Sequence, residues 1–281
     1  MSCYPNQGRI NKHMRKTQLI VLIILAVSLL LLNCATTGPG GKKSLILIST
    51  SDEVSIGQSM SKEVETQNKV VADPEVENYV NGVGQKLAGL SDRTDLQYHY
   101  KVLESSDINA FACPGGYIYV YSGLLKTIDN EAQLAGVMAH EIGHVVARHS
   151  VKRLQQVLGI QVLLSIALGQ SSEITQQAVS TGVSVILQGY SRDNEYEADY
   201  DGALYMTKAG YNPEGMIQLF QKFVAMEQDK KTTALDKLFE SHPPSADRIT
   251  RVQEEIKSFN LGDKPLVFGQ EEYQKIKSRI K

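Results

Sequence analysis

A helix-favouring segment without proline runs from Glu131 past Gln156, and the sequence HEIGH at residues 140–144 lies in its middle. Apolar residues surround HEIGH on this segment, so the predicted helix belongs to the protein interior. Two imidazoles and a carboxylate buried without partners would be strongly unfavourable, because burial removes their water. The rest of the chain must therefore fold so that it supplies those partners. The apolar residues are Leu134, Val137, Ile142, Val145 and Val146.

The spacing of His140 and His144 suits a metal ion. Four residues advance an α-helix by about 400°, so the two imidazoles emerge about 40° apart and one turn from each other. Both nitrogens can then reach a single zinc ion at bond lengths of about 2.0–2.1 Å. Glu141 lies beside this face, where its carboxylate can act on a water molecule as general base. The alternative is a helix with histidines at the surface, and the apolar context favours zinc.

Two histidines do not complete a zinc site, and the following residues of the same helix add no ligand. One known extension requires glycine three residues and histidine six residues beyond His144, but those positions hold Ala147 and Ser150. His149 would lie about 140° from His144 around a continuous helix. We therefore expect His149 to interact with solvent or a neighbouring acid.

A downstream glutamate is another common third ligand of zinc. The sequence SRDNEYEADYDGA, residues 191–203, forms a dense acidic cluster on a predicted helix. Glu195 and Asp199 share one helix face at i, i+4 spacing, and so do Glu197 and Asp201. Spacing alone leaves both pairs as candidates.

HEIGH, followed about fifty residues later by SRDNEYEAD, resembles the zinc peptidase family that includes the CaaX prenyl protease and the HtpX protease. The resemblance implies one zinc ion per chain, with Glu195 as its third ligand. Asp199 is then the carboxylate that accepts a hydrogen bond from a ligand histidine and orients it, and Glu197 faces away. Three further blocks match the family: NAFACPGGYIYVYSGLL (109–125), EAQLAGVMAHEIGHVVARHS (131–150) and SHPPSADRI (241–249).

The first of these blocks is where the resemblance implies substrate binding. A strand containing Tyr117, Ile118 and Tyr119 would border the cleft and pair with an extended substrate through backbone hydrogen bonds. Asn109 and Ala110 would hold the substrate backbone. Such pairing reads the backbone more than the side chains, so it implies broad specificity.

The last block is where the resemblance implies control of the site. His242 would occupy the open zinc position and keep the enzyme latent, whereas its alternative role is that of a surface loop histidine. Arg248 would either face the developing oxyanion or brace the loop.

Outside these blocks, periodicity predicts an α+β protein that is mostly helical with a small sheet. The apolar run at 157–169 is too short to cross a bilayer, so we expect a buried helix or an apolar lid. Nothing marks a second domain, and the resemblance implies a single zincin-type metallopeptidase domain over residues 51–281, with its sheet bordering the cleft. Helices are expected at 54–71, 74–90, 131–156, 173–188, 192–209, 213–228, 246–258 and 270–279, and strands at 96–103 and 117–121.

The N-terminal region predicts export. Residues 19–32, LIVLIILAVSLLLL, contain no charge and follow a basic stretch. Fourteen apolar residues are short for a membrane span, which needs about 20, and suit a signal peptide over residues 1–33. A retained short anchor is the alternative.

The residues around Cys34 predict a lipid anchor. Leu31-Leu32-Asn33-Cys34 resembles the lipobox of bacterial lipoproteins, in which the cysteine is acylated, although Asn33 departs from the usual small residue. Residues 34–50 read as a flexible tether. Cys113 is then the one thiol left in the domain, and we expect it to be a packed residue rather than a ligand.

Composition and resemblance together lead to an expected function. The chain of 281 residues carries a net charge of −2, which gives no electrostatic basis for nucleic-acid binding. The family resemblance implies a zinc-dependent endopeptidase, and the resemblance to a lipobox implies that it is lipid-anchored, at the outer membrane and facing the periplasm. Its substrates would be misfolded or misassembled envelope proteins, and the outer-membrane assembly machinery a partner. The alternative is a zinc-containing envelope chaperone or assembly factor with little or latent proteolytic activity.

Overall fold

The computed structural model describes residues 18, 20–21, 34–35, 44–170, 172–228, 235–243, 246–259 and 265–280. These residues fall into two units, the first containing the described residues up to Leu47 and the second containing those from Ile48 onward. In the first unit, β1 (Cys34–Ala35) pairs antiparallel with β2 (Ser44–Leu45). The predicted signal peptide lies almost entirely outside the described residues. Within those residues, every helix is too short or too polar to traverse a bilayer.

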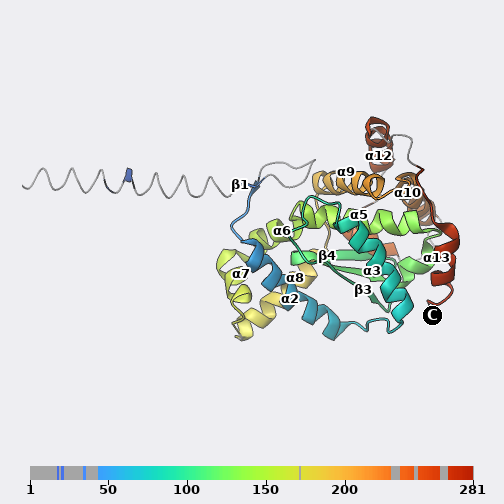
Figure 1. Cartoon of the computed structure of the whole chain (residues 1–281). Helices are drawn as coiled ribbons and strands as arrows, with labels where there is room; N and C mark the ends of the chain where they lie inside the picture. Colours follow the sequence, from blue (N-terminus) through green and yellow to red (C-terminus); the bar gives the residue numbers. More distant parts are fainter. Residues whose placement is uncertain are drawn as a thin grey trace, which may run out of the picture. The chain divides into compact units, whose positions relative to one another are not determined.

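The second unit is mostly helical around one three-stranded sheet, which confirms the predicted fold class (Figure 1). The sheet has the order β3 (His99–Leu103), β5 (Tyr117–Tyr121), β4 (Ala110–Cys113). Strand β3 runs parallel to β5, and β4 runs antiparallel to it. The sequence did not predict β4, because its residues Ala-Phe-Ala-Cys show no alternation of polar and apolar side chains.

This order corrects the predicted substrate strand. Strand β5, with Tyr117, Ile118 and Tyr119, lies in the centre of the sheet and is paired on both sides. A central strand has no free edge to offer an extended peptide. The edge strands are β3 and β4, so any strand addition on the side of Asn109 and Ala110 would occur at β4.

Two long helices carry the acidic and histidine motifs and pack directly against each other. They are α5 (Glu131–Val146) and α9 (Arg192–Lys208), which run side by side in Figure 1, with the sheet on the other side of α5. A methyl group added at Gly143 would lie 2.9 Å from Cα of Ala198. This contact brings the backbones of α5 and α9 close together and places their motifs opposite each other.

The remaining helices surround this pair and the sheet. Helix α2 (Thr50–Gln67) begins at an N-cap by Ser49, and α3 (Pro74–Ala88) at an N-cap by Asp73 with proline in its first turn. A short 3₁₀ turn, η1 (Pro114–Gly116), connects β4 to β5. The others are α4 (Ser122–Thr127), α6 (His149–Leu158), α7 (Ile160–Ala167), α8 (Glu173–Leu187), α10 (Glu214–Gln228), α11 (Asp236–Ser241), α12 (Ala246–Ser258) and α13 (Gln270–Lys277).

The helix predicted to continue from Glu131 past Gln156 is in fact two helices. Helix α5 ends at Val146, Arg148 has the left-handed backbone angles φ 53° and ψ 36°, and α6 begins at His149. A left-handed residue cannot continue a right-handed helix. The direction of every side chain after Arg148 therefore differs from the one that a continuous helix gives.

The apolar run at 157–169 is only partly buried, so of the two expected forms, a buried helix or an apolar lid, the fully buried helix is wrong. Leu163 and Ile166 of α7 are buried, whereas Val157 and Leu168 are 55% and 73% exposed. The run therefore contributes one narrow stripe to the core.

Candidate metal centre

Helix α5 presents two histidine nitrogens to one point in the interior. His140 and His144 are both buried, and their Nε2 atoms lie 3.0 Å apart. Because two Nε2 atoms at this distance cannot both carry a proton, at least one lone pair faces the other ring. A cation between the rings could be bound by the lone pairs of both Nε2 atoms.

Two further side chains complete a cluster of donor atoms. Glu195, near the start of α9, has its carboxylate oxygens 3.4 Å from Nε2 of His140 and 3.4 Å from Nε2 of His144. His242, just after α11, has Nδ1 3.2 Å from His140 Nε2 and 3.1 Å from Glu195 Oε1. All four residues are buried, and one donor atom of each lies within 4.8 Å of the others.

Five of the six pairs among these four residues have separations close to those of a tetrahedral zinc site. Bonds of about 2.0–2.1 Å in a tetrahedron place neighbouring ligand atoms about 3.3 Å apart. The separations given above run from 3.0 to 3.4 Å. Three nitrogens and one carboxylate are also a donor set that zinc accepts.

A buried ion-pair network holds the cluster from behind. Asp199 Oδ1 lies 2.9 Å from His140 Nδ1, on the ring side opposite the cluster. Arg248 on α12 donates to both oxygens of Asp199 at 2.7 Å and lies 3.0 Å from Glu195 Oε2. Arg248 also donates to the carbonyl of Pro243, next to His242. Of its two expected roles, this geometry favours bracing the loop.

The charges of the cluster shift its pKa values in opposite directions. Burial opposes the charge on His140, but the carboxylates of Asp199 and Glu195 raise its pKa to about 10. Burial also opposes the charge on Glu195, but His242 and Arg248 hold its pKa well below the usual range. Burial lowers the pKa of His144 well below its usual value. Without a metal, the cluster therefore keeps an ionised carboxylate beside a neutral His144.

Glu141 lies next to the cluster without belonging to it. Its Oε1 lies 3.5 Å from Nε2 of His242, and its buried Oε2 has no hydrogen-bond partner among the described residues. Burial raises the pKa of this carboxyl group. A buried carboxylate with an unused oxygen is poised to accept a proton.

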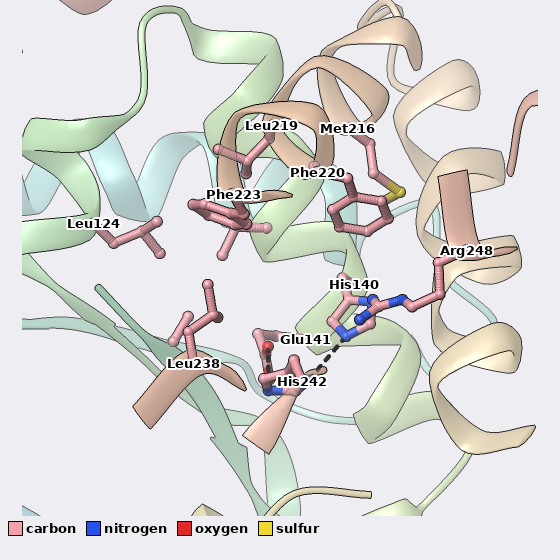
Figure 2. Close-up of a pocket in the computed structure, with 13 residues that line it drawn as sticks. Leu124, His140, Glu141, Met216, Leu219, Phe220, Phe223, Leu238, His242 and Arg248 are labelled. Atoms are coloured by element: carbon pink, nitrogen blue, oxygen red, sulfur yellow. Dashed lines mark hydrogen bonds and ion pairs between the residues drawn. The ribbon is translucent and has the colours of Figure 1, made fainter. Parts of the chain in front are cut away.

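Glu141 also lines an apolar cavity of about 40 Å³, which extends away from the cluster. Figure 2 shows Leu124, Leu219 and Phe223 on the side of this cavity away from His140 and Arg248, whereas Phe220 lies against Arg248. The volume exceeds the 10–15 Å³ or so that one water molecule needs. The apolar lining includes Leu124, Leu219, Phe220, Phe223 and Leu238.

Edge strand β4 begins beside this cavity. Ala110 lines the cavity, and the side chain of Asn109 accepts hydrogen bonds from the Ala110 N–H at 2.9 Å and from Ser241 Oγ at 3.3 Å. Asn109 therefore ties the start of β4 to the segment that carries His242. Tyr119 instead points to α2, where its hydroxyl donates to Glu65.

Sequence reasoning missed other residues of the centre. His149 is fully buried against His144, and Tyr190, after α8, stacks on the His144 ring at 4.2 Å between centroids. The expected contact of His149 with a neighbouring acid is confirmed by Glu197, 3.4 Å from its Nε2 atom, whereas a continuous helix does not predict its contact with His144. Nothing in the local sequence marks Tyr190. His242 is buried, so the alternative prediction, that it is a surface loop histidine, is wrong.

The fold and the cluster together define a metalloendopeptidase of the zincin type. Comparison with known protein families agrees, since residues 74–256 match the family described as Peptidase family M48. The chain therefore belongs to peptidase family M48.

Individual relatives cover much of this chain. The beta-barrel assembly-enhancing protease of Escherichia coli is 27% identical over 86% of this chain and 51% of its own length. Metalloprotease YcaL of the same organism is 28% identical over 75% of this chain and 82% of its own length. The mitochondrial metalloendopeptidase OMA1 of Schizosaccharomyces pombe is 33% identical over 63% of this chain and 52% of its own length. The chain spans about half the length of the beta-barrel assembly-enhancing proteases that it matches.

Proposed function

We propose that this chain hydrolyses internal peptide bonds of misfolded or misassembled cell-envelope proteins. His140, His144 and Glu195 would hold one zinc ion, and Glu141 would be the general base. When bound, zinc would polarise the scissile carbonyl and lower the pKa of a water molecule toward neutrality. The observation that carries this proposal is the convergence of four buried donor side chains within 4.8 Å of one another, with the free oxygen of Glu141 beside them.

In this proposal each neighbouring residue has a defined task. Glu141 takes a proton from the attacking water and passes it to the nitrogen of the leaving amine, so the carboxylate is regenerated in each cycle. Asp199 holds His140 by its Nδ1 atom, and Arg248 holds Asp199 and Glu195 in place. These contacts fix the ligands before a substrate arrives.

His242 would keep the centre latent. Its Nδ1 atom lies 3.1–3.2 Å from donor atoms of His140 and Glu195, so it would occupy the fourth position that a hydrolytic site leaves open for water or substrate. Ser241 at the end of α11 also contacts Asn109 at the start of β4. Activity would therefore require the segment from Leu238 to His242 to move away.

Replacement of His242 tests this latency. We expect His242→Ala to cleave an unfolded protein faster than the parent chain, with zinc content unchanged. Glu240→Ala, on the exposed side of the same short helix, is the matched control. If both variants cleaved at the parent rate, His242 would have no controlling role.

The apolar cavity supports a preference for unfolded substrates. A peptide bond bound at Glu141 would present a neighbouring side chain to a lining of leucine and phenylalanine. Folded proteins bury most such bulky apolar side chains, whereas unfolded proteins expose them. Leu238 lines the cavity and lies four residues before His242, so release of His242 would also enlarge the cavity.

Product analysis tests this preference. We would digest one outer-membrane β-barrel protein in its folded form and in its urea-unfolded form with His242→Ala, and sequence the products. The expected result is cleavage of the unfolded form alone, with a bulky apolar residue at one fixed position next to the cut. Equal cleavage of both forms would reject misfolded proteins as the substrate class.

Localisation rests on the predicted lipoprotein signal, in which Cys34 carries the lipid and anchors the domain to a membrane facing the periplasm. The relatives named for β-barrel assembly support an outer-membrane setting and contact with the assembly machinery. Palmitate labelling of the parent and of Cys34→Ser in bacteria tests the anchor. Label that persists in Cys34→Ser would exclude acylation at this residue.

The alternative is an envelope chaperone or assembly factor with latent proteolysis. The contact of His242 with Glu195 supports this alternative, because it would block the position that water needs for hydrolysis. Glu141→Gln separates the two functions, because it removes the base and leaves the predicted metal ligands. A protease loses cleavage in this variant. Under metal-replete conditions, a chaperone suppresses aggregation of unfolded protein equally in both forms and cleaves in neither.

A further inference from the structure

The second ring nitrogen of His144 has a buried partner of its own. His144 Nδ1 lies 2.9 Å from Nδ1 of His149, which is the first residue of α6 and is 0% exposed. On the far side of that ring, His149 Nε2 lies 3.4 Å from Oε2 of Glu197 on α9. The side chains thus form a continuous chain, Glu197–His149–His144, which ends at the donor cluster.

The break between α5 and α6 creates this arrangement. On a continuous helix His149 would point about 140° away from His144. Arg148 is the one non-glycine residue with a positive φ in the described part of the chain, and this conformation turns His149 back toward α5. Such a conformation is strained and persists only where the surroundings hold it.

A buried ion pair holds Arg148 in this conformation. Its Nε atom lies 2.9 Å from Glu53 Oε2, and its Nη2 atom donates to the carbonyl of Ile48 at 2.7 Å. Glu53, on α2, is 1% exposed and also accepts hydrogen bonds from Arg93 at 3.1 and 3.2 Å. The first turn of α2 therefore fixes the direction of a side chain in the metal centre.

The donor and acceptor roles in these hydrogen bonds determine which ring nitrogen of each histidine carries a proton. A carboxylate only accepts, so Nε2 of His149 donates to Glu197, and Nδ1 of a neutral His149 is then an acceptor. Nδ1 of His144 must be the donor in the 2.9 Å contact. The remaining lone pair of His144 lies on Nε2, the atom that faces His140 and Glu195. The ring of Tyr190 stacks on His144 at an interplanar angle of 23° and limits its rotation.

We propose that His149 and Glu197 are positioning residues that hold the His144 imidazole in the tautomer and orientation needed to bind the metal. Asp199 stands in the corresponding place behind His140, so each histidine from α5 is fixed by a side chain behind it. This inference rests on the proposed metal site. It also gives a function to the left-handed Arg148 and to the buried Glu53.

Zinc affinity and the tautomer of His144 test the proposal together. We would measure zinc affinity of the full metal-free chain by competition with a chromophoric chelator. Loss of such partners typically weakens metal binding by about 10- to 100-fold, which we expect for His149→Phe and Glu197→Ala. Glu197→Gln should stay close to the parent, because the amide oxygen still accepts from His149. His99→Ala, a histidine on β3 that stacks on Tyr117, is the control.

Nitrogen-15 NMR of the metal-free chain reads the tautomer directly. His144 should carry its proton on Nδ1 in the parent and in Glu197→Gln, and lose this preference in His149→Phe. Parent-like zinc affinity in both His149→Phe and Glu197→Ala, or an unchanged tautomer in His149→Phe, would overturn the proposal. A parent chain that binds no zinc would instead overturn the metal site, and the tautomer would still decide whether His149 orients His144.

Discussion

The contact between Gly143 and Ala198 sets how closely the two ligand-bearing helices approach. In Gly143→Ala, the new methyl carbon would lie 2.9 Å from both Cα and the carbonyl oxygen of Ala198. Carbon atoms in favourable contact lie about 3.5–4.0 Å apart, so α5 and α9 must separate by several tenths of an ångström. That movement carries His140 and His144 away from Glu195. We therefore expect Gly143→Ala to lower both stability and zinc affinity.

Comparison with Gly82→Ala isolates the packing effect. Gly82 is exposed on α3, and a methyl group there would meet no atom within 4 Å. Both substitutions gain the same helix propensity of about 1 kcal/mol, so their difference in unfolding free energy is the overpacking cost of about 1–3 kcal/mol. At about 2–4 °C per kcal/mol for a domain of this size, their thermal midpoints should differ by roughly 2–12 °C.

The assay is thermal unfolding of the metal-free variants, followed by a zinc titration of each. Metal-free protein is used so that lost metal binding does not add to the packing effect. Gly82→Ala should match or exceed the parent in stability and bind zinc equally well. The reasoning is refuted if Gly143→Ala unfolds at the same temperature as Gly82→Ala and binds zinc as tightly.

Three further predictions follow from burial and charge. Burial raises the pKa of Cys113 to about 12, so almost no thiolate exists at pH 8 and iodoacetamide should label Cys113 only after denaturation; rapid labelling of the native chain would contradict its packing. Glu53→Ala leaves Arg93 and Arg148 without their buried partner and should cost about 3–5 kcal/mol in urea unfolding; a loss below about 1 kcal/mol would show that the pair does not hold α2. Chelation should lower the thermal midpoint, and zinc should restore it, because a ligand that binds only the native state stabilises it; an unchanged midpoint would speak against a native-state metal.

The parts of the centre that lie on one helix were predictable from the sequence. Helical periodicity places His140 and His144 on one face of α5, and the resemblance selects Glu195 from the acidic cluster of α9. The structure brings these three residues together. The prediction succeeds because i, i+4 spacing depends on local backbone geometry alone.

The parts that depend on long-range contacts were not predictable. His149 turns toward His144 because Glu53, about a hundred residues earlier in the chain, holds Arg148 in a left-handed conformation. Tyr117 to Tyr121 form a central strand because β3 and β4 pair on either side of them, and local propensity does not show which strand lies at an edge. The burial of His242 likewise depends on where α11 ends.

The most direct test of the central claim is a zinc-edge anomalous difference map from crystals of the zinc-loaded full chain. The claim predicts one peak per chain, bonded to His140, His144 and Glu195. A chain that takes up no zinc, or a peak elsewhere in the molecule, would contradict it.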